Sequence, residues 1–226
     1  MFFDENQAIE LCESDPSVIF NLIDENFDFL VDKILSKKKV SVNTTNENGT
    51  DVITYLLKNG YYNLVLKYMK DKTWDVNHQD KDGNTFAHIL VTKKYLEVMD
   101  IIKQIIKNKD FIPNIRNKKG ETILDKSINE EYIYTTVKIL EDERFNNIDL
   151  VSFKNLYEKY IKSNNYGVYS KMNNLEVIID TLSIKELLPN LGHIINFIKT
   201  NIENIKKDVK NGETSILDEL IYGAME

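Results

Sequence analysis

The sequence contains few of the residues that build disulfide frameworks or metal centres. Cys12 is the only cysteine among 226 residues, and none of the three histidines has a second histidine or cysteine at metal-ligand spacing. One thiol excludes an internal disulfide and a cysteine metal cluster, and it favours a reducing compartment. We therefore expect an intracellular, cytoplasmic protein with no metal and no cofactor.

Arginine is scarce, and positive charge is outnumbered by negative charge. The formal net charge is −7, the isoelectric point is about 5.2, and only Arg116 and Arg144 are arginines. An acidic chain repels nucleic acid and anionic membranes, and lysine lacks the planar fork that binds phosphate or guanine in a bidentate way. No apolar run is long enough to cross a bilayer, and the first residues carry acids where a signal peptide carries bases. These patterns predict no nucleic acid partner and no membrane partner.

Motifs that carry catalysis are also missing. The eight glycines form neither GxxxxGK[ST] nor GxGxxG. The segment DKDGNT resembles a calcium loop only at its start, because Val91 stands where the loop needs a bidentate glutamate. Cys12 lies in the segment ELCE, where we expect neighbouring carboxylates to raise the pKa of the thiol. Carboxylate pairs such as Glu130 with Glu131 arise by chance in an acidic chain. We therefore interpret the protein as a non-enzyme.

What the chain does contain is an internal repeat. Three segments read VNTTNENG, VNHQDKDG and PNIRNKKG. Their asparagines Asn43, Asn77 and Asn114 lie 34 and 37 residues apart, and a glycine follows each of them six residues later. Glycine adopts positive φ without a Cβ clash, so the segments predict three equivalent tight turns. A fourth segment, KNGETSILD at 210–218, matches KKGETILD at 118–125 with one residue inserted.

A pair of short helices is predicted to follow each turn. After Gly83, Thr85 is a suitable N-cap, and apolar residues then recur at helical spacing. A second helix is predicted from about Tyr95, with an apolar face too broad for one helix pair to bury. That face contains Leu96, Val98, Met99, Ile102, Ile105 and Ile106. Neighbouring pairs must therefore stack on one another.

This order of turn, short helix and short helix resembles the ankyrin repeat. The matching residues are Asp80, Gly83, Thr85 and His88, then Tyr95 to Val98, with Gly60, Leu64 and Val65 in the repeat before and Asn77 and Asn114 at the repeat ends. The chain departs from the family pattern where Val52, Phe86 and Ile123 replace the helix-starting proline, and where Leu56 and Leu57 replace small alanines. The resemblance implies an all-α ankyrin-repeat solenoid of helix-turn-helix units with short turn or hairpin connections. It also implies that His88 hydrogen-bonds between neighbouring turns.

The resemblance implies one ankyrin-repeat domain over residues 1–226. Residues 1–43 form a degenerate first repeat or cap, 44–140 the clear repeats, and 141–226 divergent repeats with a C-terminal cap. Helices are predicted at 17–23, 27–35, 153–161, 175–182, 184–188, 192–195 and 215–222, with an irregular connection at 163–170. Divergent repeats of this kind are found in giant viruses, intracellular bacteria and protists, which suggests a host–pathogen role in the host cytoplasm.

Repeats of this family bind proteins, so the resemblance implies a non-enzymatic scaffold that holds a partner on its concave face of turns and first helices. By the family's pattern, the variable surface positions include Glu47 and Asn48 in the first turn, and then Gln79, Lys81, Asp82, Asn84, Lys93, Arg116, Lys118 and Lys119. We interpret the second and third turns as locally basic, which predicts a partner with an acidic segment. Tyr61 and Trp74 are candidate aromatic anchors. Trp74 has a second interpretation, in which it fills a gap in the core.

An alternative function concerns the C-terminal part of the chain. Leu188 and Pro189, followed by Ile194, Ile195, Phe197 and Ile198, resemble the start of F-box-like segments. The resemblance implies a substrate adaptor that recruits a ubiquitin ligase. An ordinary helix pair of a divergent repeat accounts for the same residues, and the sequence leaves both interpretations open.

Overall fold

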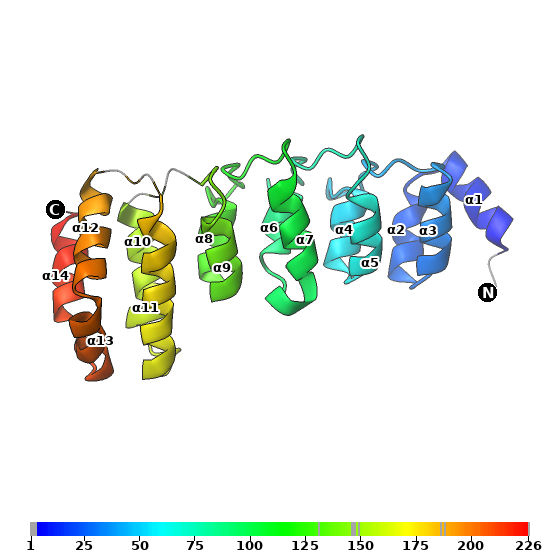
Figure 1. Cartoon of the computed structure of the whole chain (residues 1–226). Helices are drawn as coiled ribbons and strands as arrows, with labels where there is room; N and C mark the ends of the chain where they lie inside the picture. The colour runs from blue at the N-terminus through cyan, green and yellow to red at the C-terminus, as the bar shows by residue number, and fades with distance from the viewer. Residues whose placement is uncertain are drawn as a thin grey trace. The chain divides into compact units, whose positions relative to one another are not determined.

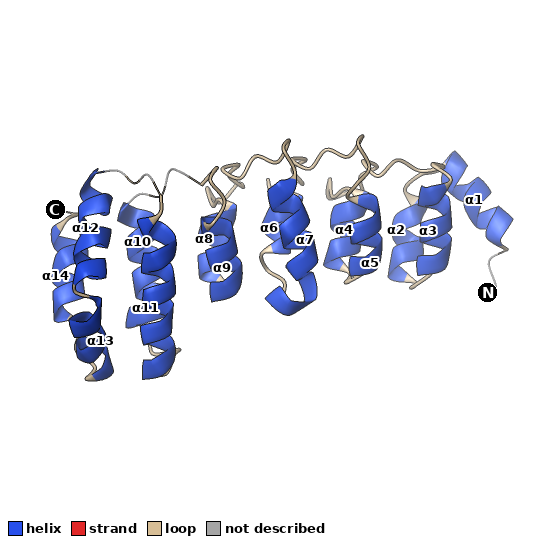
Figure 2. Cartoon of the chain, viewed as in Figure 1, coloured by secondary structure: helices blue, strands red, loops and turns tan. Residues whose placement is uncertain are grey.

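The computed structural model describes residues 4–130, 132–145, 148, 150–185, 187 and 189–225. In these ranges the regular secondary structure is helical, apart from one isolated antiparallel bridge between Thr45 and Asp51 (Figure 2). The predicted all-α class is therefore confirmed. The chain divides into two compact units, Met1–Ile123 and Leu124–Glu226. This division falls inside the 44–140 segment, and the single repeat domain stays a prediction.

The first unit is built from helix pairs (Figure 1). Its elements are α1 (Glu5–Ser14), α2 (Val18–Asp24) with α3 (Asp28–Ser36), α4 (Val52–Lys58) with α5 (Tyr62–Tyr68), and α6 (Phe86–Leu90) with α7 (Tyr95–Lys107). The first helices of the pairs form a row, because α4 contacts both α2 and α6, and the second helix α5 contacts α7. The loops that join successive pairs lie along one side of this row, at the same end of the helices (Figure 1). The predicted helices at 17–23 and 27–35 are confirmed within one residue at each end.

The start of each first helix follows from its sequence. Val52, Phe86 and Ile123 are the first residues of α4, α6 and α8 (Ile123–Asn129), so they occupy the positions predicted from the proline of the family pattern. In α4 the pattern VITYLLK places Val52, Ile53, Leu56 and Leu57 on one side, and all four are fully buried. Burying each such side chain stabilises the fold by about 1.5–3 kcal/mol. The apolar positions of the repeat therefore form the core between neighbouring pairs.

The second unit centres on α11 (Val168–Ser183), which contacts α9, the π-helical turn η1, α12 and α13. The elements are α9 (Ile133–Leu140), α10 (Leu150–Tyr157) continued by η1 (Glu158–Lys162), α12 (Pro189–Thr200), α13 (Ile202–Lys210) and α14 (Ser215–Gly223). The side chain of Asp218 attaches α14 to this core, since it accepts hydrogen bonds of 2.9 Å from both the Tyr157 hydroxyl and the Lys162 ammonium. The helix predicted at 215–222 is confirmed.

Two predictions for the second unit need correction. The irregular connection predicted at 163–170 is shorter than expected, because α11 already begins at Val168. Gly192 does not begin a helix, because α12 already runs from Pro189 through it to Thr200. One helix of each unit, α1 in the first and α13 in the second, was not predicted, since each has few buried positions and these are interrupted by charged residues. A helix at 184–188 cannot be scored, because residues 186 and 188 lie outside the described ranges.

Candidate functional site

The three predicted turns have the same internal hydrogen bonds. We name them the first turn (residues 46–50), the second turn (80–84) and the third turn (117–121), and together the turn ridge. In the second turn, the Asp80 Oδ1 accepts hydrogen bonds from the backbone N–H of Asp82 at 3.0 Å and of Asn84 at 2.9 Å. Asn46 and Asn117 accept the equivalent pairs in the other two turns, at 2.9–3.0 Å. Side chains of Asn and Asp thus fix each loop in one conformation.

Neighbouring turns are also joined through their backbones. The N–H of Lys81 donates to the carbonyl oxygen of Asn48, and the N–H of Lys118 donates to that of Asp82, both at 2.9 Å. Each turn has its glycine at positive φ, with 71°, 77° and 79° at Gly49, Gly83 and Gly120. The predicted turn glycines are confirmed. The tips of the ridge are therefore held at a fixed spacing by backbone atoms alone.

Two of the repeated asparagines connect segments that are far apart in the sequence. The Asn43 amide donates to the carbonyl of Thr73 at 2.6 Å and accepts from the N–H of Asp75 at 2.9 Å. Asn77 makes the same pair of bonds with Asp110 at 2.7 Å and Ile112 at 2.9 Å. The asparagines that identified the repeat thus hydrogen-bond successive repeats to one another within the first unit.

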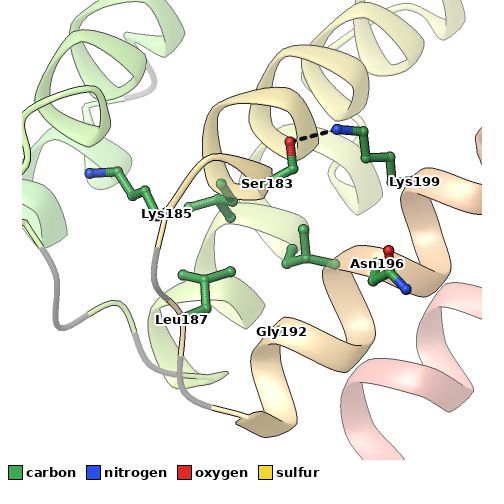
Figure 3. Close-up of a pocket in the computed structure, with 8 residues that line it drawn as sticks. Ser183, Lys185, Leu187, Gly192, Asn196 and Lys199 are labelled. Carbon is green, nitrogen blue, oxygen red and sulfur yellow. Dashed lines mark hydrogen bonds between the residues drawn. The ribbon is translucent and has the colours of Figure 1, made fainter.

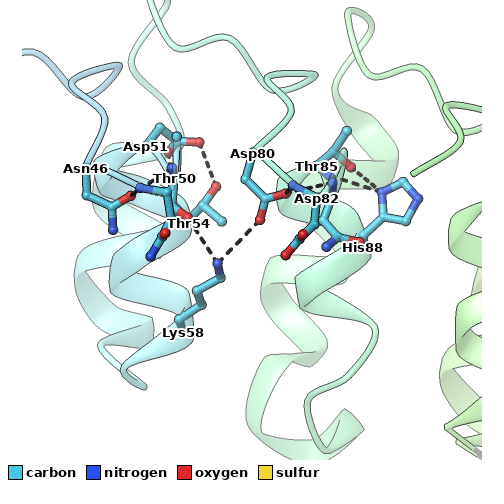
Figure 4. Close-up of polar contacts among 12 residues, drawn as sticks. Asn46, Thr50, Asp51, Thr54, Lys58, Asp80, Asp82, Thr85 and His88 are labelled. Atoms are coloured by element: carbon cyan, nitrogen blue, oxygen red, sulfur yellow. Dashed lines mark hydrogen bonds and ion pairs between the residues drawn. The ribbon is translucent and has the colours of Figure 1, made fainter. Parts of the chain in front are cut away.

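A polar cap begins the first helices α4 and α6, next to the ridge (Figure 4). The backbone N–H of Thr85 and its hydroxyl both contact Nδ1 of His88, at 3.2 and 2.8 Å. Since Nδ1 accepts from that N–H, Nε2 carries the proton and donates to the carbonyl of Glu121 at 3.0 Å. The expectation that His88 hydrogen-bonds between turns is confirmed.

In the preceding repeat, Asp51 replaces the capping threonine. Its carboxylate accepts from the N–H of Thr54 at 2.9 Å and from the Thr54 hydroxyl at 2.7 Å (Figure 4). Burial raises the pKa of Asp51 above its ordinary value, and the bonds from Thr54 with the nearby charge of His78 offset this only in part. The site therefore contains one buried carboxyl group that the sequence did not single out.

The basic side chains beside the first helices have structural partners. Lys58 donates to the Thr50 hydroxyl at 3.1 Å and forms an ion pair of 3.5 Å with Asp80, whose side chain is 7% exposed (Figure 4). Lys93 donates to the carbonyl of Lys58 at 3.0 Å. Both lysines connect adjacent repeats, so Lys93 is less available to a partner than the sequence suggested.

Several other predicted contact residues also hold the fold together. Gln79 donates to the carbonyls of Gly83 at 2.6 Å and Arg116 at 3.0 Å. The Asn84 side chain accepts from Asn117 at 3.0 Å, and the Arg116 guanidinium donates to the carbonyl of Gly120 at 2.5 Å. Tyr61 donates to the carbonyl of Ile23 or to the Asn26 side chain, which places it between helix pairs. The bonds from Gln79 to Arg116, from Asn117 to Asn84 and from Tyr61 depend on the distance between repeats, which the sequence pattern does not contain.

Trp74 lies in the core. It is 8% exposed, and its ring packs edge to face on Phe86 with 5.0 Å between ring centroids. An indole with so little exposed surface offers a partner little to contact. We therefore favour its interpretation as a gap-filling residue and leave it out of the proposed surface.

Four predicted residues remain open at the tips. Lys81, Asp82, Lys118 and Lys119 are exposed, and their side chains make no hydrogen bond or ion pair within the described part of the chain. Glu47 and Asn48 occupy the equivalent positions of the first turn. The ridge thus presents three pairs of variable side chains on three identical loops.

The second unit contains a separate pocket of about 310 Å³, with Leu182, Leu187 and Ile195 among its apolar walls (Figure 3). Lys199 donates to the Ser183 hydroxyl at 3.0 Å, and Lys185 donates to the carbonyl of Asp142 at 2.8 Å. Burial lowers the pKa of Lys185. Pro189 lies at the start of α12, whereas Leu188 is outside the described residues, so the ligase-adaptor alternative stays a prediction.

Neither a metal-binding cluster nor a membrane-spanning helix is found in the part of the chain that the structure describes. In the described ranges, no three His, Cys, Asp or Glu side chains are placed to hold a metal ion. No helix among the described residues has both the length and the apolar character needed to cross a bilayer. A scan against protein-family models finds no match to this chain, and a search of curated proteins finds no similar sequence.

Proposed function

We propose that the chain is a non-catalytic protein-binding scaffold of the ankyrin type, and that its partner contacts the turn ridge and the adjacent first helices. One observation carries the proposal. The first, second and third turns have the same backbone and side-chain hydrogen bonds, whereas the two exposed residues at each tip differ. Constant loops with variable tips are what a repeat scaffold offers to a partner.

The residues that hold the turns are different from the residues exposed at the tips, and this difference supports the same function. In each turn, the side-chain oxygen that accepts the turn's backbone N–H bonds belongs to Asn46, Asp80 or Asn117. Between turns, the backbone nitrogen of Lys118 lies next to Gly83. Substitution at a tip therefore changes the surface without removing a bond that holds the turn. A binding surface can diverge in this arrangement while the fold stays the same.

A competing surface exists on the second helices. Phe29 and Leu96 are each the second residue of their helix, α3 and α7, and they are 68% and 87% exposed. Exposed apolar side chains at equivalent positions are also suited to contact a protein. An experiment that tests the proposal must therefore distinguish partner contact at the ridge from partner contact at Phe29 and Leu96.

Site-specific photo-crosslinking makes that distinction. A photoreactive amino acid replaces Lys81 or Lys119 on the ridge, and Phe29 or Leu96 on the second helices, in otherwise identical chains of 226 residues. We expect the same protein to be captured from both ridge positions, to bind the purified chain directly, and to be captured at neither control position. Capture from Phe29 and Leu96 alone, or direct binding that survives alanine at all six tip positions, would overturn the proposal.

A further inference from the structure

The charges at the tips change in order along the ridge. The tip residues are Glu47 and Asn48 in the first turn, Lys81 and Asp82 in the second, and Lys118 and Lys119 in the third. Their formal charges sum to −1, 0 and +2. Arg116 precedes the third turn and Glu121 is its last residue, and their opposite charges cancel, so the tip keeps its excess of positive charge.

The second turn is less basic than the sequence suggested. Asp80 lies inside that turn and is paired with Lys58, so these two charges compensate each other. At the tip itself, Lys81 is adjacent to Asp82 in the chain. Of the two turns that we expected to be basic, only the third has a net positive charge at its tip.

The third turn keeps its cations available. Lys118 and Lys119 use only backbone atoms to hold the turn, through the bonds of their N–H groups to the Asp82 carbonyl and the Asn117 side chain. In the second turn, Asp82 accepts the bond from Lys118 through its backbone carbonyl and has an exposed side chain. In the third turn, the Glu121 side chain accepts a hydrogen bond of 3.0 Å from Asn117. The third turn thus has two adjacent exposed lysines on a protein whose net charge is −7.

We propose that the third turn is the recognition point for a segment of the partner that is rich in aspartate or glutamate, with the first turn repelling the acidic end of that segment. This inference rests on the proposed function. A carboxylate-rich segment complements Lys118 and Lys119, and its placement over Glu47 is unfavourable, so the order of charges sets the direction in which the segment lies. Exposed ion pairs contribute modestly to affinity and are screened by salt, so the interaction acts chiefly on specificity and on the rate of association.

Fluorescence anisotropy with a defined peptide tests the inference. The probe is a labelled peptide of consecutive glutamates, and its binding to the 226-residue chain is measured at low and at high salt. A glutamine peptide of equal length is the neutral control. We expect binding of the glutamate peptide at low salt, loss of that binding at high salt, and affinity about tenfold or more lower for Lys118→Glu with Lys119→Glu.

A matched variant separates local charge from net charge. Lys37→Glu with Lys38→Glu changes the net charge by the same amount at two exposed positions after α3. Equal weakening by both double variants, or no binding of the glutamate peptide to the wild-type chain, would overturn the inference. Binding of a phosphoserine peptide alone would also overturn it, because the recognised group would then be phosphate.

Different experimental results would reject this inference and reject the proposed function. If the ridge crosslinks a partner while the glutamate peptide does not bind, only the acidic partner segment is rejected. If the ridge crosslinks nothing, the scaffold surface itself is rejected.

Discussion

A Cβ atom at Gly83 would lie 2.8 Å from the backbone nitrogen of Lys118, the atom that joins the second turn to the third. Gly120 has the same positive φ, yet a Cβ there would meet no atom within 4 Å. Substituting each glycine by alanine therefore distinguishes the cost of a left-handed backbone, which applies at both positions, from the cost of crowding, which applies only at Gly83. At Gly120 only the strain of a left-handed residue applies.

We predict that Gly83→Ala lowers the free energy of unfolding by about 2–4 kcal/mol, and Gly120→Ala by about 1–2 kcal/mol. Urea unfolding followed by the fluorescence of Trp74, which lies in the first unit, measures both variants. Equal losses would show that the turns do not touch as closely as the distance indicates.

Asp51 is predicted to make the stability of the first unit depend on pH. Its pKa in the folded chain lies above the ordinary value of 3.8, because burial disfavours the ionised form. The folded state therefore binds more protons than the unfolded state between these two pKa values, and stability falls as pH rises through that window. Asp51→Asn removes the titration and can still accept from the N–H of Thr54.

We expect Asp51→Asn to flatten the pH profile of unfolding and to be at least as stable as wild type at neutral pH. Asp51→Ala is the control, because it removes the cap as well and should cost about 1 kcal/mol. The same Trp74 signal at a series of pH values reports all three chains. A wild-type slope that persists in Asp51→Asn would assign the pH dependence to another group.

Two adjacent threonines in the second unit are predicted to respond in opposite ways to loss of the hydroxyl. The Thr136 hydroxyl is bonded to Ser127 at 3.1 Å and Tyr160 at 2.9 Å, whereas the Thr135 hydroxyl is buried with no partner in the described ranges. An unpaired buried hydroxyl costs about 1–3 kcal/mol, and valine has nearly the same shape as threonine. Hydrogen exchange of peptides from 124–226 should show slower opening in Thr135→Val and faster opening in Thr136→Val. The reverse order would contradict the assigned bonds.

The thiol of Cys12 is predicted to be unreactive in the folded chain. Burial, followed by the charge of Asp15, raises its pKa to about 11. Only a small fraction is therefore thiolate at neutral pH, which slows attack on a disulfide reagent. As a control, Leu11→Cys in a Cys12→Ala background places a thiol at a neighbouring position that is 44% exposed. We expect rapid labelling of that variant and slow labelling of wild type until it is unfolded, and comparable rates would mean that α1 detaches readily.

The sequence predicted the local features well and the contacts between repeats poorly. Thr85 as a cap, the glycines of the three turns, and the first residues of α4, α6 and α8 all follow from short-range chemistry, because each depends on neighbours within a few residues. The roles of Gln79, Lys93 and Tyr61 depend on side chains that reach residues 35 to 38 positions away. A single sequence contains no measure of that separation in space.

The matching hydrogen bonds of the three turns make their tips interchangeable. Since the N–H groups at 48, 82 and 119 all bond to an Asn or Asp side chain two residues earlier, the tip side chains could be exchanged between turns without a new loop. Placing two lysines at positions 47 and 48, and their acidic and neutral counterparts at 118 and 119, would reverse the order of charges and turn a bound acidic segment end for end. Each turn thus supports any pair of tip side chains, and the binding specificity of the ridge can be changed by substituting one pair of tip residues at a time.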